Sequence, residues 1–120
     1  MNPRIDKTSF GSITIDGETY EHDILIRLDG EVKKRKKKLS KKYYGSSHTI
    51  SLEEAEYVYE KGAQKLLIGS GQTGMVRLSD EAEDFFNKKG CEIYLKPTVT
   101  AIKEWNKVKG SIIGLFHVTC

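Results

Sequence analysis

The stretch best suited to bind a ligand is a glycine-rich turn that follows an apolar run. Leu66-Leu67-Ile68 leads directly into three glycines spaced G-x-G-x-x-G. Glycine tolerates positive φ and lets other groups come close to the backbone. Such a turn can direct several backbone N–H groups at one anion. We predict a site for a small anionic ligand or a protein partner at Gly69, Ser70, Gly71, Gln72, Thr73 and Gly74. The alternative is a tight turn beside packed elements.

The spacing matches a dinucleotide-binding fingerprint, but the surrounding residues do not. In that fingerprint the third glycine opens a helix, and an acidic residue about 20 positions later holds the ribose. Here an extended segment, Met75 to Leu78, follows the third glycine, and the next helix signal comes only at Ser79. The nearest acid at a comparable distance, Glu92, begins a strand-like run instead of ending one. We therefore expect no nicotinamide cofactor, and no other cofactor is predicted.

His117 and Cys120 are a second pair of residues that could do chemistry. Their i, i+3 spacing places the two side chains on opposite faces of a strand. A shared zinc would also need further ligands to complete four, and no other His or Cys stands at motif spacing, so we expect no metal. A Cys120 nucleophile activated by His117 is the enzymatic alternative. The plainer interpretation is a buried histidine bonded to backbone and a cysteine used for packing.

A basic segment is the third candidate site. Residues 31–42 sum to a charge of +7, which leaves −4 for the rest of the chain. Lysines could neutralise phosphates, and Tyr43 and Tyr44 could stack on bases. We predict a solvated edge ribbon whose lysines prevent strand pairing, with weak nucleic-acid binding as the alternative. The residues concerned are Lys33, Lys34, Arg35, Lys36, Lys37, Lys38, Lys41 and Lys42.

The first half of the chain has the pattern of an antiparallel ribbon. Alternation from Phe10 to Ile15 predicts one strand, and Asp16-Gly17 is a strong hairpin signal. Alternation resumes over Thr19 to Leu28 and predicts a second strand. Asp29-Gly30 predicts a further reversal into the basic segment.

The second half repeats a helix–strand pattern three times. Ser51 and Glu54 form a capping box before the first helix, and Asp80 and Glu83 repeat it before the second. Pro97 suits the first turn of a third helix. Strands follow at Leu66 to Ile68, Cys91 to Leu95 and Ser111 to Val118. Helices that alternate with apolar strands imply parallel neighbours joined by right-handed crossovers. The carboxyl ends of such strands, where ligands bind in open α/β sheets, would bring the glycine turn, His117 and Cys120 together. We therefore count His117 and Cys120 among the predicted ligand-binding residues.

Length and composition indicate one domain, residues 1–120. No apolar run reaches the roughly 20 residues that a membrane span needs. The N-terminal residues show no signal-peptide core, and two cysteines do not suggest a disulfide framework. We expect a cytoplasmic protein, without membrane contact, that is a monomer or a small homo-oligomer.

Three segments together resemble the Mth-domain family, which includes an adipogenesis-associated protein and mitochondrial complex I assembly factors. They are Ser9-Phe10-Gly11, the stretch Ile68 to Gly74, and the closing Gly114 to Cys120. The resemblance covers nearly the whole chain. It implies an α/β fold in three layers, with a mixed central sheet, parallel β-α units in the second half and an N-terminal antiparallel β-ribbon. It implies no agreed catalytic residues.

We therefore expect a non-enzymatic binding or assembly-type protein with a partner or anionic ligand at the glycine turn. The alternatives are an enzyme that uses His117 and Cys120 at the same edge, or weak nucleic-acid binding through residues 33–42.

Overall fold

A five-stranded mixed sheet forms the middle layer of this computed structural model, which describes residues 2–120; Met1 lies outside the described residues. The strand order is β5 (Val32–Lys34), β4 (Ile24–Ile26), β10 (Ile112–His117), β7 (Lys65–Ser70) and β9 (Glu92–Lys96). β10, β7 and β9 are parallel, whereas β4 is antiparallel to both β5 and β10. The predicted mixed sheet with parallel β-α units is confirmed.

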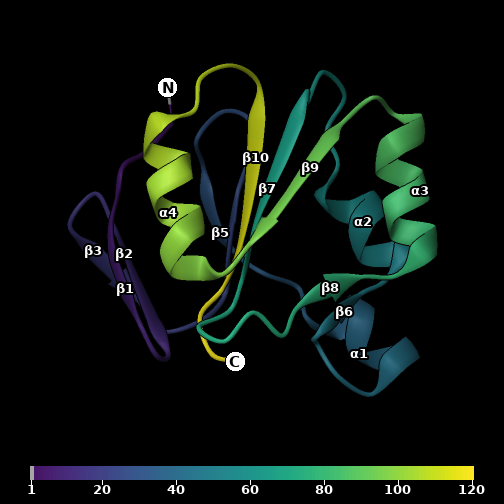
Figure 1. Cartoon of the computed structure of the whole chain (residues 1–120), viewed down its shortest axis with the longest axis horizontal. Coiled ribbons are helices and arrows are strands. Elements are labelled where there is room, and N and C mark those ends of the chain that lie inside the picture. Colours follow the sequence, from purple (N-terminus) through teal and green to yellow (C-terminus); the bar gives the residue numbers. More distant parts are fainter. Residues whose placement is uncertain (1) are drawn as a thin grey trace.

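Helices cover both faces of this sheet (Figure 1). α2 (Leu52–Val58) and α3 (Asp80–Lys88) lie on one face, and α4 (Thr98–Lys107) lies on the other. A short parallel pair, β6 (Thr49–Ile50) and β8 (Arg77–Leu78), joins the segments that precede α2 and α3. All three predicted helices are present, and Ser51 caps α2 as expected. α3 is capped by Ser79, one residue earlier than the predicted Asp80, because the Ser79 hydroxyl accepts the Ala82 N–H.

The N-terminal ribbon is a separate sheet of β1 (Ile5–Ser9), β2 (Ser12–Ile15) and β3 (Glu18–Tyr20) that packs beside α4. The hairpin at Asp16-Gly17 is confirmed. Two strand predictions were wrong. Phe10 lies in the turn between β1 and β2, and the predicted strand Thr19 to Leu28 breaks before Asp23 so that the chain can cross from this sheet to the central one.

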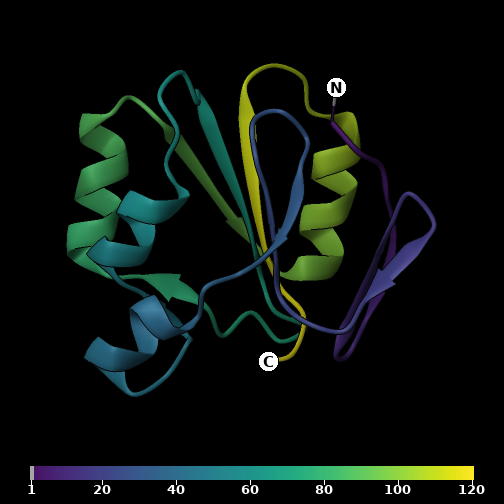
Figure 2. The same ribbon diagram turned by 180° about the vertical axis from the view of Figure 1, so that it is seen from behind.

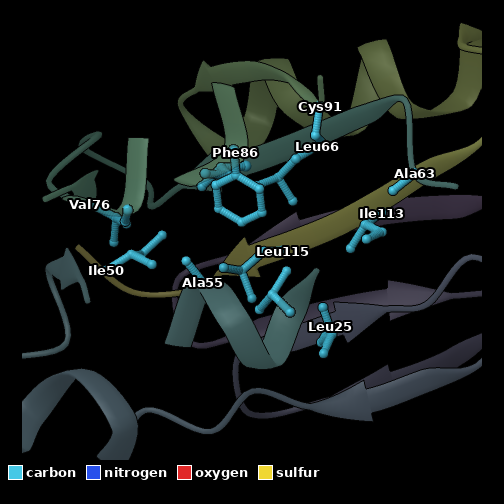
Figure 3. Close-up of a cluster of buried hydrophobic side chains, with 13 residues drawn as sticks. Leu25, Ile50, Ala55, Ala63, Leu66, Val76, Phe86, Cys91, Ile113 and Leu115 are labelled. Carbon is cyan, nitrogen blue, oxygen red and sulfur yellow. The ribbon is translucent and has the colours of Figure 1, made fainter. Parts of the chain in front are cut away.

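Alternating apolar residues divide the core between the two faces of the central sheet. On the α2 and α3 side, Leu66 and Ile68 of β7 pack with Phe86 and Leu115 (Figure 3). On the α4 side, Leu67 packs with Trp105 and with residues of the ribbon. β7 and β10 are therefore covered on both faces. No helix of the described chain is long and apolar enough to cross a membrane.

Candidate functional site

Strand register places a row of polar residues along the carboxyl edge of the parallel strands. Ser70 ends β7 and pairs with His117, the last residue of β10. β4 runs antiparallel to β10, so the residue that precedes it, Asp23, lies opposite His117. β5 runs antiparallel to β4, and the Arg35 N–H donates to the Asp23 carbonyl at 3.0 Å. Residues 35, 23, 117 and 70 therefore stand side by side across four strands.

Arg35 is the centre of a buried ionic cluster, which we define as Asp23, Arg35, Glu54 and His117. Its guanidinium donates from Nε and Nη2 to the two Glu54 oxygens, at 2.7 and 3.0 Å. Nη1 donates to Asp23 Oδ2 at 3.0 Å, and Nη2 also donates to the Ser47 carbonyl at 2.9 Å. The side chains of Arg35, Asp23 and Glu54 are each only 1% exposed. A planar fork that satisfies two carboxylates at once is a geometry that lysine cannot reproduce.

Asp23, the second carboxylate of the cluster, accepts hydrogen bonds from three different residues. Oδ2 accepts from His117 Nδ1 at 2.7 Å, Oδ1 accepts from the Val118 N–H at 2.9 Å, and the Lys37 ammonium lies 3.6 Å away. Burial by itself would raise the pKa of this carboxyl. The hydrogen bond and charge of His117, the Val118 N–H and the Arg35 charge outweigh burial and lower the Asp23 pKa from 3.8 to about 2. Asp23 is therefore an anion at neutral pH.

Glu54 does not close the predicted capping box. Ser51 accepts the Glu54 N–H at 3.1 Å, as the motif requires. The Glu54 carboxylate instead turns away to Arg35 and to the Ser40 hydroxyl, and Ser40 accepts the Ser51 N–H at 3.0 Å. The first turn of α2 is thereby tied to the basic segment.

The glycine turn directs its N–H groups at the end of the chain, a segment 118–120 that we call the strap. The Gln72 N–H donates to the Thr119 carbonyl at 2.7 Å, and the N–H groups of Thr73 and Met75 donate to the Cys120 backbone oxygen at 3.1 and 3.2 Å. The Thr73 hydroxyl donates to the same oxygen at 2.7 Å. Several donors of the turn thus converge on one oxygen, and that oxygen belongs to the protein itself (Figure 2 shows the turn after β7 beside the C-terminus).

Gly71 allows the glycine turn and the strap to come this close to each other. It has φ +107°, and a Cβ there would lie 2.2 Å from the Cys120 carbonyl carbon and 2.9 Å from His117 Cδ2. Its own N–H donates to the Thr98 hydroxyl at 2.8 Å, and that hydroxyl donates to the His117 carbonyl at 2.7 Å. The absence of a side chain at position 71 therefore lets the turn, the strap and α4 contact one another.

His117 bonds to Thr119 as well as to Asp23. Its Nε2 lies 3.1 Å from the Thr119 hydroxyl, and its ring meets the His48 ring edge-on with centroids 5.4 Å apart. His117 is 3% exposed, and its partners are side chains instead of the predicted backbone groups. Cys120 remains partly exposed, whereas burial of the Cys91 thiol raises its pKa to about 11. Residues 2–120 hold no group of three or more His, Cys, Asp or Glu side chains arranged for a metal ion.

The basic segment is the predicted edge ribbon only in part. Residues 32–34 form the edge strand β5, whereas α1 (Lys38–Tyr44) is a helix that was not predicted. The inclusion of Arg35 among surface cations was wrong, because it is 4% exposed and neutralised by Asp23 and Glu54. Lys42 pairs with Glu53 at 2.8 Å.

A basic cleft of about 660 Å³ lies between this segment and the strap. Lys34, Lys36, Lys37 and Lys38 line it, together with Glu21, His22, Val118 and Thr119. The buried Asp23 is also part of the lining and is held by Arg35, His117 and Lys37. The cleft therefore combines several lysines with Asp23, whose charge is balanced, and with the exposed carboxylate of Glu21.

Comparison with known proteins decides the family. A family profile described as "Protein of unknown function (DUF498/DUF598)" matches residues 5–111. The chain belongs to the DUF498/DUF598 family. It is similar to conserved hypothetical protein PH1505 from Pyrococcus horikoshii, with 35% identity, a TM-score of 0.91 and coverage of 98% of this chain and 99% of that one.

Two further structures confirm the resemblance to the Mth-domain family. A protein called MT938 is 30% identical, with a TM-score of 0.82 and coverage of 99% of this chain and 100% of that one. A Bordetella pertussis protein described as a Mth938-like domain shares the fold at 14% identity and a TM-score of 0.61, over 97% of this chain and 85% of that one.

Replacing Arg35 tests whether the ionic cluster stabilises this DUF498/DUF598 domain. We expect Arg35→Met to lower the free energy of unfolding by about 3–5 kcal/mol, because Asp23 and Glu54 would stay buried without their cation. The matched control Lys33→Met, in the same segment but exposed, should change it by less than about 0.5 kcal/mol. Urea denaturation measures the free energy of unfolding of both variants. An equal loss of stability in Arg35→Met and Lys33→Met would show that the ionic cluster does not stabilise the domain.

Low pH should reduce the folding stability of the domain because it protonates Asp23. A carboxyl with a lowered native pKa stabilises the fold above its unfolded pKa and loses that contribution as pH falls through the native value. The contribution should therefore fade between about pH 4 and pH 2 and amount to about 2 kcal/mol. We expect thermal unfolding of Asp23→Asn to depend less steeply on pH in this window than that of the wild type. If the unfolding temperatures of the wild type and Asp23→Asn fall equally with pH, Asp23 does not cause the loss of stability in acid.

Gly71 and Gly74 form a matched pair for testing the strap contact. Both have positive φ, but a Cβ at Gly74 has no neighbour closer than 3.6 Å. We expect Gly74→Ala to cost about 1 kcal/mol for its backbone alone. Gly71→Ala should cost at least about 3 kcal/mol, because its Cβ would overlap the Cys120 carbonyl. Denaturant melts compare them, and equal costs would show that the strap moves aside freely.

Proposed function

We propose that this domain binds an anionic group, carried by a protein partner or a small ligand, in the basic cleft beside the strap. The proposal makes it a non-enzymatic binding or assembly-type protein. The observation that supports it most is the lysine lining of a cleft of about 660 Å³ at the carboxyl edge of the parallel strands. Open α/β sheets bind ligands at this edge.

Charge distribution also supports the cleft as the binding surface. The basic segment 31–42 carries +7 in a chain whose other residues sum to −4, so an anion is drawn to one face. Two carboxylates line the cleft. Arg35, His117 and Lys37 surround Asp23, so repulsion of an anion comes mainly from the exposed Glu21, which the lysines outnumber. A phosphate or carboxylate in the cleft would meet exposed lysines instead, with charge-assisted hydrogen bonds.

The glycine turn contributes to this proposal by holding the strap. Residues 70–74 touch the anion only if the strap leaves, since their donors already bind Thr119 and Cys120. In the proposal the turn shapes one wall of the cleft through Val118 and Thr119. We place the protein in the cytoplasm, where Cys91 and Cys120, which form no disulfide, would stay reduced.

A charge-reversal experiment tests the proposal. The cleft variant carries Lys34, Lys36 and Lys38 changed to glutamate, and Lys37 is kept because it pairs with Asp23. The control variant carries the same change at Lys103, Lys107 and Lys109, which are exposed in or just after α4. We expect at least a tenfold loss of affinity for pyrophosphate and for a glutamate-rich peptide in the cleft variant alone, measured by NMR titration.

Other results of that titration have defined meanings. If both variants lose the same affinity for pyrophosphate and the peptide, the loss comes from the change in net charge alone, which would contradict the proposal. An oligonucleotide should bind weakly and dissociate near physiological salt, since each phosphate contact adds about 0.9 to the salt slope. Tight oligonucleotide binding that survives physiological salt and is lost in the cleft variant would make nucleic-acid recognition the main function.

Enzymatic acyl transfer is the second candidate, and one contact favours it. Thr119, His117 and Asp23 form the sequence of hydroxyl, imidazole and carboxylate that activates a nucleophile, at 3.1 and 2.7 Å. Thr119 thus replaces Cys120 as the candidate nucleophile. Binding ranks above catalysis because Arg35 and Lys37 already neutralise Asp23, which weakens its support for a charged imidazole.

A single substitution distinguishes the two candidates. If the protein is an enzyme, it should hydrolyse activated esters such as p-nitrophenyl acetate, and Thr119→Val should abolish turnover. We expect instead that wild-type and Thr119→Val proteins release nitrophenol equally slowly. A wild-type rate at least a hundredfold above that of Thr119→Val would overturn this ranking.

A further inference from the structure

The two edges of the central sheet differ in how they are protected. β5 is short and carries Lys33 and Lys34, and lysines on a short edge strand discourage pairing with another chain. β9 is longer and places Ile93, Tyr94 and Leu95 between its charged ends. Leu95 is 41% exposed. Figure 1 looks onto the β9 edge, and no helix or strand formed by residues 2–120 lies in front of it.

The backbone of β9 presents its free groups at two residues. The Glu92 N–H donates toward β7, to the Gln64 carbonyl at 2.9 Å, and parallel pairing continues to Lys96. Hydrogen-bonding direction alternates along a strand, so Glu92, Tyr94 and Lys96 bond inward. Ile93 and Leu95 therefore direct their N–H and C=O groups outward, away from the sheet.

Only one antiparallel register uses all these outward groups between two copies of β9. Ile93 of one copy must stand opposite Leu95 of the second copy, which gives four backbone hydrogen bonds around a twofold axis at Tyr94. A shift that centres the pair on Ile93 or on Leu95 keeps fewer bonds. The shift toward Leu95 also sets Ile93 opposite Pro97, which has no N–H to donate.

The same register also places opposite charges next to each other across the interface. Glu92 of one copy stands opposite Lys96 of the second copy, and the twofold axis repeats the pair. The Tyr94 hydroxyl bonds to the Glu92 carboxylate and holds it on that face. On the other face Ile93 stands opposite Leu95, so both positions next to the axis are apolar. Any other strand partner would have to reproduce this pattern, whereas a second copy supplies it by symmetry.

We propose that β9 pairs antiparallel with β9 of a second copy of this chain, so that two central sheets join into one. The contact is small, which predicts a weak, reversible homodimer. The basic cleft, between β5–α1 and the strap, stays free on both copies. The proposal is independent of the anion-binding function.

Disulfide trapping tests both the dimer and its register. Two Tyr94 Cα atoms across the axis would be about 4.5 Å apart, within the span of a disulfide. We expect Tyr94→Cys, in a Cys120→Ser background, to form a covalent dimer under mild oxidation. Glu92→Cys should not, because its two copies would lie about 13 Å apart, and neither should Lys34→Cys on the β5 edge. Equal trapping at all three positions, or none at Tyr94→Cys, would overturn the proposal.

A charge swap provides an independent test on exposed residues. Glu92→Lys or Lys96→Glu would place like charges opposite each other twice per dimer. Each should lower the trapping rate of Tyr94→Cys at least tenfold, and the double variant Glu92→Lys/Lys96→Glu should restore it. Circular dichroism verifies that all variants fold. A double variant that traps as slowly as the single ones would contradict the register.

Discussion

The guanidinium of Arg35 is the interaction on which the rest of the site depends. It lies between two buried carboxylates, Asp23 just before β4 and Glu54 from α2, and donates to both. A buried ion pair is costly to form, and removal of one member leaves an uncompensated charge. Within residues 2–120 no buried side-chain nitrogen or oxygen lacks a hydrogen-bond partner. Such a complete network favours one arrangement of the sheet edge over others.

The consequences of this network extend to the glycine turn and the strap. Asp23 bonds to the His117 ring and to the Val118 N–H, which fixes the start of the strap. The turn after β7 then holds the other end through Thr119 and Cys120. The strap and the lysines of β5–α1 form the two walls of the basic cleft. Two segments that are distant in sequence thus depend on one buried cation for their relative position.

Much of the fold was predictable from sequence because its signals are local. The helix caps, Pro97 and the succession of helices and apolar strands in the second half predicted α2, α3, α4 and the parallel strands. The ionic cluster was not predictable, because its members are 12 to 94 positions apart and meet only through strand register. One signal was available: Arg35 is a single arginine among lysines, and arginine is the residue preferred for buried, forked contacts with carboxylates. The glycine spacing predicted converging donors but could not show that they bind the strap.

Amide hydrogen exchange in Arg35→Lys tests most directly whether Arg35 positions the strap. Lysine keeps the charge but cannot bond to both carboxylates. We predict that protection of the Val118, Gln72 and Thr73 amides falls by at least tenfold more than that of core amides such as Leu66. The control variant Lys33→Arg should leave these amides protected. If protection instead falls equally throughout the domain, or stays unchanged at these three amides, the strap is held independently of Arg35 and the account is wrong.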